Sequence, residues 1–445
     1  MNINSFSNRY LVLFLFFILA VSGILSCRAL YADGSFFLYQ MLINGGLFVF
    51  DVHRSFAQYI VEWPVYLAVK LGVQDLNALM RIFSFGIIAI PIFFWFVALI
   101  LQFKTAIFWL LVLAFSVTYL RSGFFAVGEF NTAYGLVALS ISIILKKNIS
   151  NFLNLILLLS SFILIYSYES MLFLGIILLI ACCVRFTFDK NDNSLTKLTL
   201  IISGCFYIFA SFVGFRSIFF SRNINLESTI NYGGILEPYI LYLIVMIFLA
   251  MFLFIDIKRT LKVTIVLFAL FLTLLYVFYV IRWDKTGISY GYYNYGYRSL
   301  GAFMLAFLLC ISCAAYFIPQ LIKNNLIKID IKLLSYIVGM IFIVQSSIML
   351  FHTVSYYKWL KSFESVAMNI QGLVPIDKTK IGVGYSGVAG YNWPWTNSTL
   401  SVLLRGNAES IVTNASNFKG WETFDPNLIE KYPLANFKKL KPLFP

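Results

Sequence analysis

Long apolar stretches alternate with short polar connections along most of this chain. They recur from end to end at about the length that crosses a hydrocarbon core roughly 30 Å thick. The pattern predicts an all-α polytopic membrane protein with about eleven spans. The predicted spans are 10–27, 82–101, 105–121, 133–145, 151–166, 170–186, 198–218, 238–256, 263–281, 299–318 and 333–352.

The connection after the first span is the longest, and its pattern predicts two helices on the membrane surface. Ser35–Leu42 reads as a short helix ended by Gly45-Gly46. His53–Gly72 begins too polar to span, and Pro64 is expected to break or kink it. This segment predicts an amphipathic helix in the interface, with Trp63 and Tyr66 at headgroup depth.

The chain turns polar after residue 354. Tyr356–Ile370 predicts an amphipathic helix that continues the last span. Lys380–Gly387 reads as a short strand, and Ser398–Gly406 as a helix or a second strand. We therefore expect a transmembrane domain at 1–353, which includes the outer loop 28–81, and a small mixed α/β extracytoplasmic domain at 354–445.

Charge gives the predicted spans an orientation. Only 12% of the 445 residues are charged and 61% are hydrophobic, with a net charge of +14 and a mean hydropathy of +0.87. Basic residues collect in cytoplasmic loops, so the net charge is a topological signal and we expect no nucleic-acid partner. One set of alternate connections carries ten lysines, and the other carries only Lys70 and Lys285 up to residue 353. This bias predicts a cytoplasmic N-terminus and an external C-terminal domain.

Acidic residues follow the opposite distribution. With this topology, nine of the 13 acids before residue 354 lie outside: Asp33, Asp51, Glu62, Asp75, Glu129, Glu169, Glu227, Glu237 and Asp284. The middles of the spans carry almost no ionisable residue, whereas ion-coupled carriers place charges or broken helices there. The pattern therefore favours chemistry at the outer face over transport.

Asp33 lies just beyond the first span, in Tyr31–Tyr39 (YADGSFFLY). A carboxylate directly before a helix can serve as its N-cap, which is one interpretation of Asp33. Its surroundings suggest another. A first span, an acid at the start of a long outer loop with two surface helices, many further spans and an outer C-terminal domain together resemble the GT-C fold.

The resemblance is to polyprenyl-phosphate-sugar-dependent glycosyltransferases, in particular the serotype-converting glucosyltransferases that modify bacterial O-antigen. It covers the layout of the whole chain and includes His53–Pro64 (HRSFAQYIVEWP) and an aromatic C-terminal segment. Many members have an Asp-Glu pair where this chain has Asp33-Gly34. The resemblance implies a bacterial inner-membrane enzyme with a lipid-linked sugar donor and a glycan acceptor such as O-antigen.

Such an enzyme transfers a hexose to an acceptor hydroxyl, which loses a proton to one carboxylate as it attacks. The resemblance assigns this base to Asp33, with Glu129 as a second catalytic acid and Asp51 as an alternative base. Inversion at the sugar needs one base alone. Glu129 has a plainer interpretation as a loop carboxylate paired with Arg121.

Further residues are expected to bind the donor or acceptor. Glu169 lies in a short turn between spans, where we expect a hydrogen bond from Tyr166 or Tyr168, and it has a purely structural alternative. Arginine can bind phosphate through paired hydrogen bonds, and anchoring at the membrane interface is the alternative role for the arginines. Tyrosine and tryptophan can stack on sugar rings, and an aromatic belt or simple packing is the alternative role for them. The expected binding residues are Asp51, His53, Arg54, Glu169, Arg282, Tyr293, Arg298, Trp393 and Trp395.

The sequence leaves metal dependence open, because His53 and His352 are the only histidines and two alone do not make a site. Two other functions remain as alternatives. An O-antigen polymerase or ligase also has many spans, but it carries its large outer loop nearer the C-terminal half. A flippase for lipid-linked oligosaccharides requires a wide hydrophilic cavity, for which the spans offer no charged lining.

Overall fold

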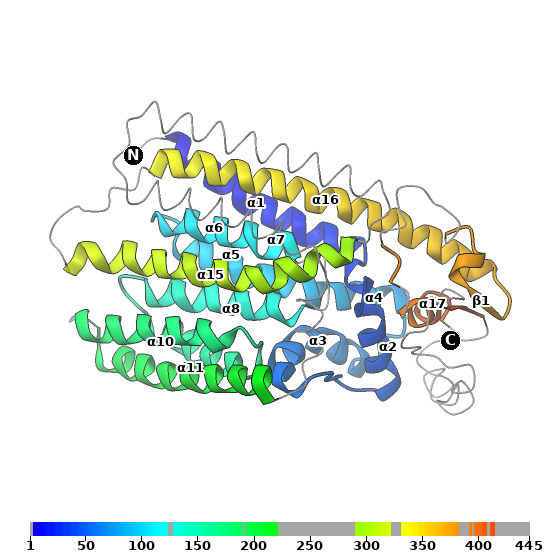
Figure 1. The fold of residues 1–445 in the computed structure, drawn as a ribbon, viewed down its shortest axis with the longest axis horizontal. Helices are drawn as coiled ribbons and strands as arrows, with labels where there is room; N and C mark the ends of the chain where they lie inside the picture. The colour runs from blue at the N-terminus through cyan, green and yellow to red at the C-terminus, as the bar shows by residue number, and fades with distance from the viewer. Residues whose placement is uncertain are drawn as a thin grey trace.

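The computed structural model describes residues 3–122, 128–189, 192–220, 290–321, 331–381, 391–393, 396–406 and 410–413. Helices account for most of these residues and run side by side along the long axis of the molecule (Figure 1). In chain order the first elements are α1 (Ile3–Leu25), η1 (Arg28–Leu30), α2 (Gly34–Asn44), η2 (Val52–Arg54), α3 (Ser55–Lys70), α4 (Leu76–Ser84), η3 (Phe85–Ala89) and α5 (Ile90–Leu101).

The middle of the chain continues with shorter helices. These are α6 (Ile107–Val117), α7 (Tyr119–Ser122), α8 (Glu129–Ile144), α9 (Asn151–Ile163), η4 (Leu164–Tyr166), α10 (Met171–Phe188) and α11 (Ser194–Phe220). The last described elements are α15 (Tyr290–Leu321), α16 (Ile331–Asn369), β1 (Leu373–Pro375), η5 (Ile376–Lys378), α17 (Asn397–Arg405) and β2 (Ile411–Thr413).

Five helical segments in the described part are long and apolar enough to cross a membrane: Asn8–Leu25, Leu76–Leu101, Met171–Phe188, Ser194–Phe220 and Leu334–Asn369. Shorter apolar helices are Ile107–Val117, Glu129–Ile144, Asn151–Tyr166 and Gly301–Ala314. The predicted class, an all-α membrane protein, fits these findings. The predicted spans 238–256 and 263–281 lie outside the described residues, so the count of eleven stays a prediction.

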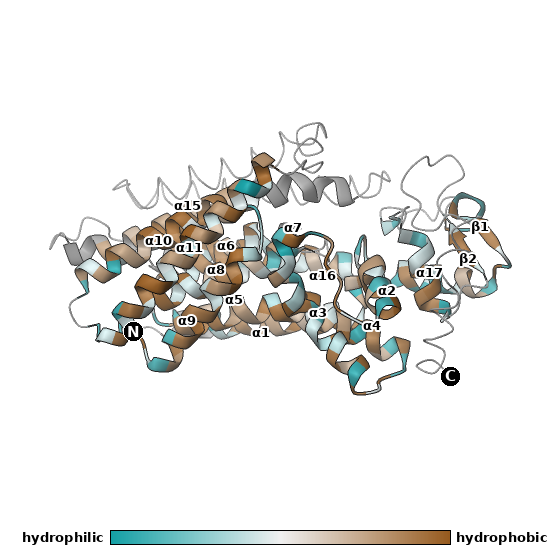
Figure 2. Cartoon of the chain, turned by 90° about the horizontal axis from the view of Figure 1, so that it is seen from below, coloured by the Kyte–Doolittle hydropathy of each residue, from teal (hydrophilic) through white to brown (hydrophobic). Residues whose placement is uncertain are grey.

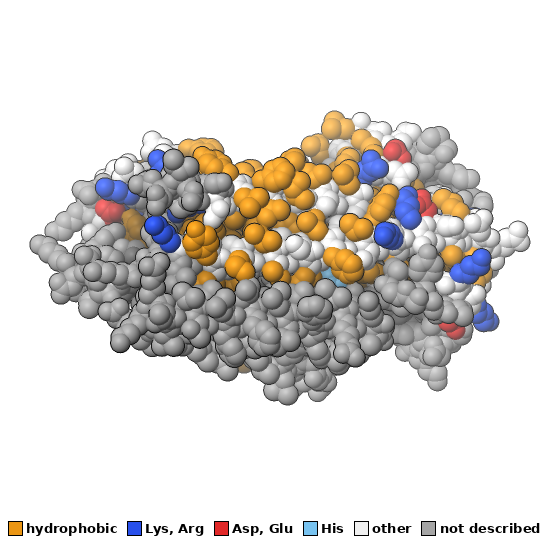
Figure 3. Space-filling model, turned by 90° about the horizontal axis from the view of Figure 1, so that it is seen from above, with side chains coloured by type: hydrophobic (Ala, Val, Ile, Leu, Met, Phe, Trp, Pro, Cys, Tyr) orange, Lys and Arg blue, Asp and Glu red, His pale blue; other side chains and the backbone are white. Residues whose placement is uncertain are grey.

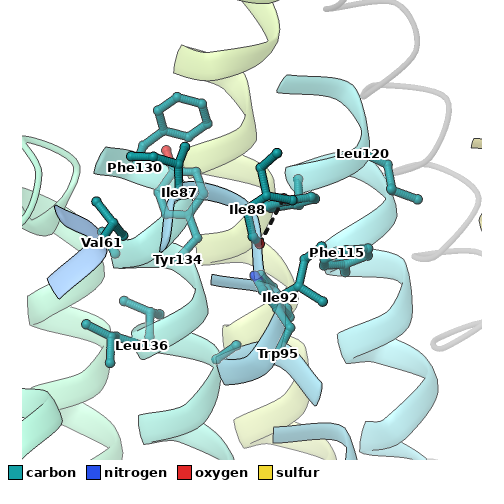
Figure 4. Close-up of a cluster of buried hydrophobic side chains, with 14 of the residues drawn as sticks. Val61, Ile87, Ile88, Ile92, Trp95, Phe115, Leu120, Phe130, Tyr134 and Leu136 are labelled. Atoms are coloured by element: carbon teal, nitrogen blue, oxygen red, sulfur yellow. Dashed lines mark hydrogen bonds between the residues drawn. The ribbon is translucent and has the colours of Figure 1, made fainter. Parts of the chain in front are cut away.

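Two of the short helices form the centre of the bundle. Every residue of α6 and of α8 is buried, because α5, α15 and α16 contact α6, while α5, α9 and α10 contact α8. Trp95, Phe115 and Tyr134 belong to the apolar cluster that joins these layers (Figure 4). The face of the bundle seen in Figure 3 shows a broad apolar belt between two groups of charged side chains.

One group of elements lies at the end of the bundle away from the N-terminus: α2, α3, α4 and α17 (Figure 1). Here α2 ends at Gly45, whose φ of 61° suits glycine, as the sequence predicts. Helix α3 runs unbroken through Pro64, so the expected break is wrong, whereas a kink at Pro64 stays a prediction. At the opposite end, Arg185 bonds to Asp192 at 2.7 Å and to the Ile144 carbonyl at 2.5 Å, which joins two predicted cytoplasmic connections.

The C-terminal elements pack against this same end. Helix α16 has 39 residues, about 58 Å at 1.5 Å per residue, so it continues past the apolar span as the sequence predicts. The residues of the predicted segment Ser398–Gly406 are helical up to Arg405 and form most of α17, whereas Lys380–Gly387 lies almost entirely outside the described residues. Strands β1 and β2 pair in parallel, and hydropathy turns more polar around α17 and β1 (Figure 2).

Candidate functional site

Helix α3 buries its polar side chains. Arg54, at the start of the helix, and Gln58 and Glu62 recur every four residues and so share one face, and all three are buried. The opposite face carries the exposed apolar side chains Tyr59, Trp63 and Leu67. This arrangement directs the polar face of α3 into the protein and leaves its apolar face exposed, the reverse of the pattern in a soluble surface helix.

The guanidinium of Arg54 joins three connections of the chain. Its Nε donates to Glu169 Oε1 at 3.0 Å, with a second, short bond from Nη2. Its Nη1 donates to Glu129 Oε2 at 3.4 Å. Asp51 Oδ2 lies 3.6 Å from Nε. The first outer loop, the start of α8 and the turn before α10 therefore meet at one buried cation.

Electrostatics keeps this cation charged. Burial alone lowers the pKa of Arg54, but the adjacent Glu169 and Glu129 raise it above its ordinary value. The ring of Tyr168 lies over the guanidinium, with its centroid 5.1 Å from Cζ. A buried ion pair of this kind costs stability when one partner is removed, so the cluster holds the three connections together.

Asp51 and His53 lie at the more exposed edge of the cluster. Asp51 Oδ1 accepts from the backbone N–H of His53 at 2.9 Å and lies 3.1 Å from His53 Nδ1. The carboxylate of Asp51 thereby caps η2, the short turn that positions Arg54. Five of the predicted site residues are thus brought together by the structure: Asp51, His53, Arg54, Glu129 and Glu169.

Close backbone packing fixes the position of Glu169. A Cβ added at Gly214 of α11 would lie 2.7 Å from the Glu169 carbonyl oxygen and 2.8 Å from the Leu172 nitrogen. Only glycine permits this approach of α11 to the start of α10. The sequence predicts a hydrogen bond from Tyr166 or Tyr168 to Glu169, which stays a prediction, and the structure shows the guanidinium of Arg54 as an ion-pair partner of Glu169.

Gln58 and Glu62 are two further residues of the site that the sequence does not predict. Gln58 Nε2 donates to Glu129 Oε1 at 3.1 Å, and the Phe48 N–H donates to Glu62 Oε2 at 2.8 Å. Both side chains line a cavity of about 10 Å³ together with Phe37, Val61, Ile87, Gly128, Glu129 and Thr132. The four-residue spacing of Arg54, Gln58 and Glu62 was the signal that could have found them.

Asp33 occupies the N-cap position of α2, but its side chain makes no capping bond to that helix. It is half-buried, and its carbonyl accepts from Phe37 N at 3.0 Å. Phe37 therefore lies one turn further along the same face, and it lines the cavity beside Glu129. The preceding Ala32 has a φ of 54°, a left-handed conformation that strains an alanine.

The aromatic residues of the tail pack against the start of the first loop. Trp393 and Tyr391 contact Tyr31, with ring centroids 6.2 and 6.1 Å apart. His352 Nδ1 lies 2.7 Å from the Tyr391 hydroxyl. Trp393 is half-buried in this cluster, as the packing alternative expects. The cluster holds the C-terminal tail against Tyr31, which lies two positions before Asp33 in the chain.

The remaining predicted residues are not placed in this site. Arg282 and Trp395 lie outside the described residues. Tyr293 and Arg298 belong to α15, but their side chains, like that of Arg121, lie outside the described part. Among the described residues, no group of three or more His, Cys, Asp or Glu side chains could hold a metal ion.

Comparisons with known proteins complete the picture of the site. No family model matches this chain, and neither a curated protein nor a solved structure matches it.

Proposed function

We propose that this chain is a membrane glycosyltransferase of GT-C type, located in a bacterial inner membrane. It transfers a hexose such as glucose from a polyprenyl-phosphate donor to an extracytoplasmic glycan such as O-antigen, with inversion at the sugar. The end of the bundle that carries α2, α3 and α17 faces away from the cytoplasm in this proposal, in agreement with the lysine distribution.

One observation carries the proposal. Five predicted site residues form one cluster at α3, although they come from three separate connections. Arg54 is the cation of this cluster, and the other four residues surround it. The exposed aromatic face of α3 gives a lipid-linked donor an apolar surface directly above this polar interior. A reaction between a lipid-bound sugar and a water-soluble acceptor requires such a boundary.

The proposed chemistry needs a base within reach of the acceptor hydroxyl. Asp33 keeps this role, because it is half-buried at the start of α2, next to the docked tail. Glu129 accepts hydrogen bonds on both oxygens, from Arg54 and Gln58. We therefore move Glu129 from a catalytic to a positioning role, in which it and Glu169 hold the outer connections around the reacting groups.

The leaving polyprenyl phosphate needs cations. The guanidinium of Arg54 is already shared among three carboxylates, so it does not serve this purpose in the state described. Arg282 and Arg298 remain the proposed phosphate ligands, and Tyr293 the proposed sugar-stacking residue. No divalent metal is part of the proposal.

The test is the mass of the surface glycan from cells with and without this protein. The proposal expects the repeating unit to lose the mass of one hexose when the protein is absent and to regain it on complementation. A repeat of unchanged composition, but altered chain length, would instead identify a polymerase or ligase. Accumulation of a complete precursor on the cytoplasmic side would identify a flippase.

A further inference from the structure

A small cavity lies at the polar face of α3, next to the Arg54 cluster, and the side chains of the cluster do not fill it. The cavity, of about 10 Å³, is lined by Gln58, Glu62, Glu129 and Thr132 on its polar side. A cavity needs about 10–15 Å³ and two to four polar partners to hold one water. The volume and the lining of this cavity therefore suit a single water molecule.

Gln58 has an unused acceptor beside this cavity. Its Nε2 donates to Glu129 Oε1 at 3.1 Å, which fixes the orientation of the amide. Its Oε1 is buried and accepts no hydrogen bond from the described protein. A buried acceptor without a donor is costly, so this oxygen calls for a proton donor in the cavity.

Glu62 lies one helical turn from Gln58 and, when protonated, is the titratable residue of the cavity lining that can donate a proton through water to this oxygen; the Thr132 hydroxyl is the other O–H in the lining. Its carboxyl is buried and accepts one bond, from Phe48 N at 2.8 Å. Burial raises the pKa of Glu62 to about 8, the Phe48 N–H opposes this shift, and the charge of Glu129 adds to it. Arg54 acts on the far side of Glu129, whose charge it neutralises in part. Glu62 is therefore mostly protonated at neutral pH.

We propose that Glu62 and Gln58 form a buried proton-binding site. One water in the adjoining cavity links the Glu62 carboxyl to the Gln58 amide oxygen. During transfer, this site takes up the proton released by the acceptor hydroxyl. Proton uptake during transfer rests on the function proposed above, whereas the proton-binding site itself does not.

The proton balance of this step is simple. As the acceptor oxygen bonds to the anomeric carbon, the sugar–phosphate bond breaks and its electron pair leaves with the phosphate. The acceptor proton passes first to Asp33. It then passes through water to ionised Glu62, which returns Asp33 to its carboxylate form, and Glu62 releases the proton to the surrounding water before the next turnover. Because Glu62 must be ionised to accept it, turnover should rise with pH up to about 8.

Infrared spectroscopy of the purified full-length protein in lipid nanodiscs tests the site without any substrate. A pH titration should show a protonated-carboxyl C=O band that disappears with a midpoint near 8. Glu62→Gln should remove this band, and Glu364→Gln, at the half-exposed partner of Lys361, should leave it. A band that survives Glu62→Gln, or a midpoint near the ordinary value of 4.5, would overturn the site.

Thermal stability gives a second readout with a defined sign. The pKa of Glu62 is higher in the folded protein than the ordinary 4.5, so its protonation stabilises the fold fully below pH 4.5. This contribution is lost as the pH rises to about 8. The melting temperature of the wild type should therefore fall relative to that of Glu62→Gln across this window. A constant difference between the two proteins would contradict the site.

Hexose transfer tests the uptake role. Glu62→Gln should lose the rise in turnover between pH 6 and about 8 and be slower by about 10²-fold at pH 8, the lower end for positioned proton-transfer groups. Glu62→Asp should restore the rise in part. A wild-type pH profile in Glu62→Gln would overturn the uptake role. Absence of transfer by the wild type, with the infrared band present, would refute the proposed function and leave the proton-binding site intact.

Discussion

Replacement of Arg54 by leucine is expected to destabilise the protein by about 3–5 kcal/mol, the cost of breaking a buried ion pair by removing one partner. Glu169 and Glu129 would lose their shared cation inside the protein, where both are buried. The first outer loop, α8 and the start of α10 would then repel one another at the point where Arg54 now joins them.

Arg54→Lys should fall between the wild type and leucine. A single ammonium cannot reproduce the two bonds to Glu169 and the third to Glu129, which use separate nitrogens of the planar guanidinium. The measurement is the thermal unfolding midpoint of the purified protein, with limited proteolysis of the outer loop. Arg81→Leu, at an exposed arginine of α4, is the matched control and should change the unfolding midpoint and the rate of proteolysis little. Equal effects of Arg54→Leu and Arg81→Leu would refute the role of Arg54 in holding the three connections together.

Gly86→Val should separate α3 from the bundle. A Cβ at Gly86 would overlap the Val61 carbonyl oxygen and lie 3.0 Å from its carbon, so a backbone must move. Gly86 lies in η3, a π-helical turn that lets α4 and α5 continue past α3. Overpacking of this kind costs about 1–3 kcal/mol or more. Any shift of α3 also displaces Gln58 and Glu62 from Glu129.

A glycine with space around it provides the control. At Gly339 in α16, an added Cβ would meet Trp109 at 4.0 Å, an ordinary contact, and alanine favours a helix over glycine. Gly339→Ala should therefore be neutral or slightly stabilising, whereas Gly86→Ala should already be harmful and Gly86→Val more so. The measurement is the unfolding midpoint together with hexose transfer. If Gly86→Val retained both, the close approach of η3 and α3 would have no role in the site.

The sequence predicted the helical architecture well where local signals are strong. Apolar length marked the long helices, and the glycine pair after the first surface helix marked its end at Gly45. It also identified α3 as amphipathic. Pro64 predicts a break or a kink in this helix, and the helix is continuous. The close packing of Val61 against Gly86 is a tertiary contact, and such contacts hold together helices that propensity alone would break.

The sequence predicts several residues of the Arg54 cluster but not how they pair. Asp51, Arg54, Glu129 and Glu169 were all selected, yet no sequence rule links Arg54 to Glu169, 115 positions away. Gln58 and Glu62 become evident only from helical spacing, because they share one buried face of α3 with Arg54. The polar side chains Gln58 and Glu62 face the protein and the apolar side chain of Trp63 is exposed, the reverse of the pattern in a soluble surface helix.

The most direct test of the central claim is hexose transfer by Asp33→Asn compared with Asp75→Asn. Both aspartates precede a helix at its N-cap, α2 for Asp33 and α4 for Asp75, but only Asp75 caps with its side chain, a role that asparagine can also perform. With both variants inserted at wild-type levels, we expect Asp33→Asn to lose about 10²–10⁴-fold in transfer and Asp75→Asn to remain near wild type. Full transfer by Asp33→Asn would contradict the proposed mechanism.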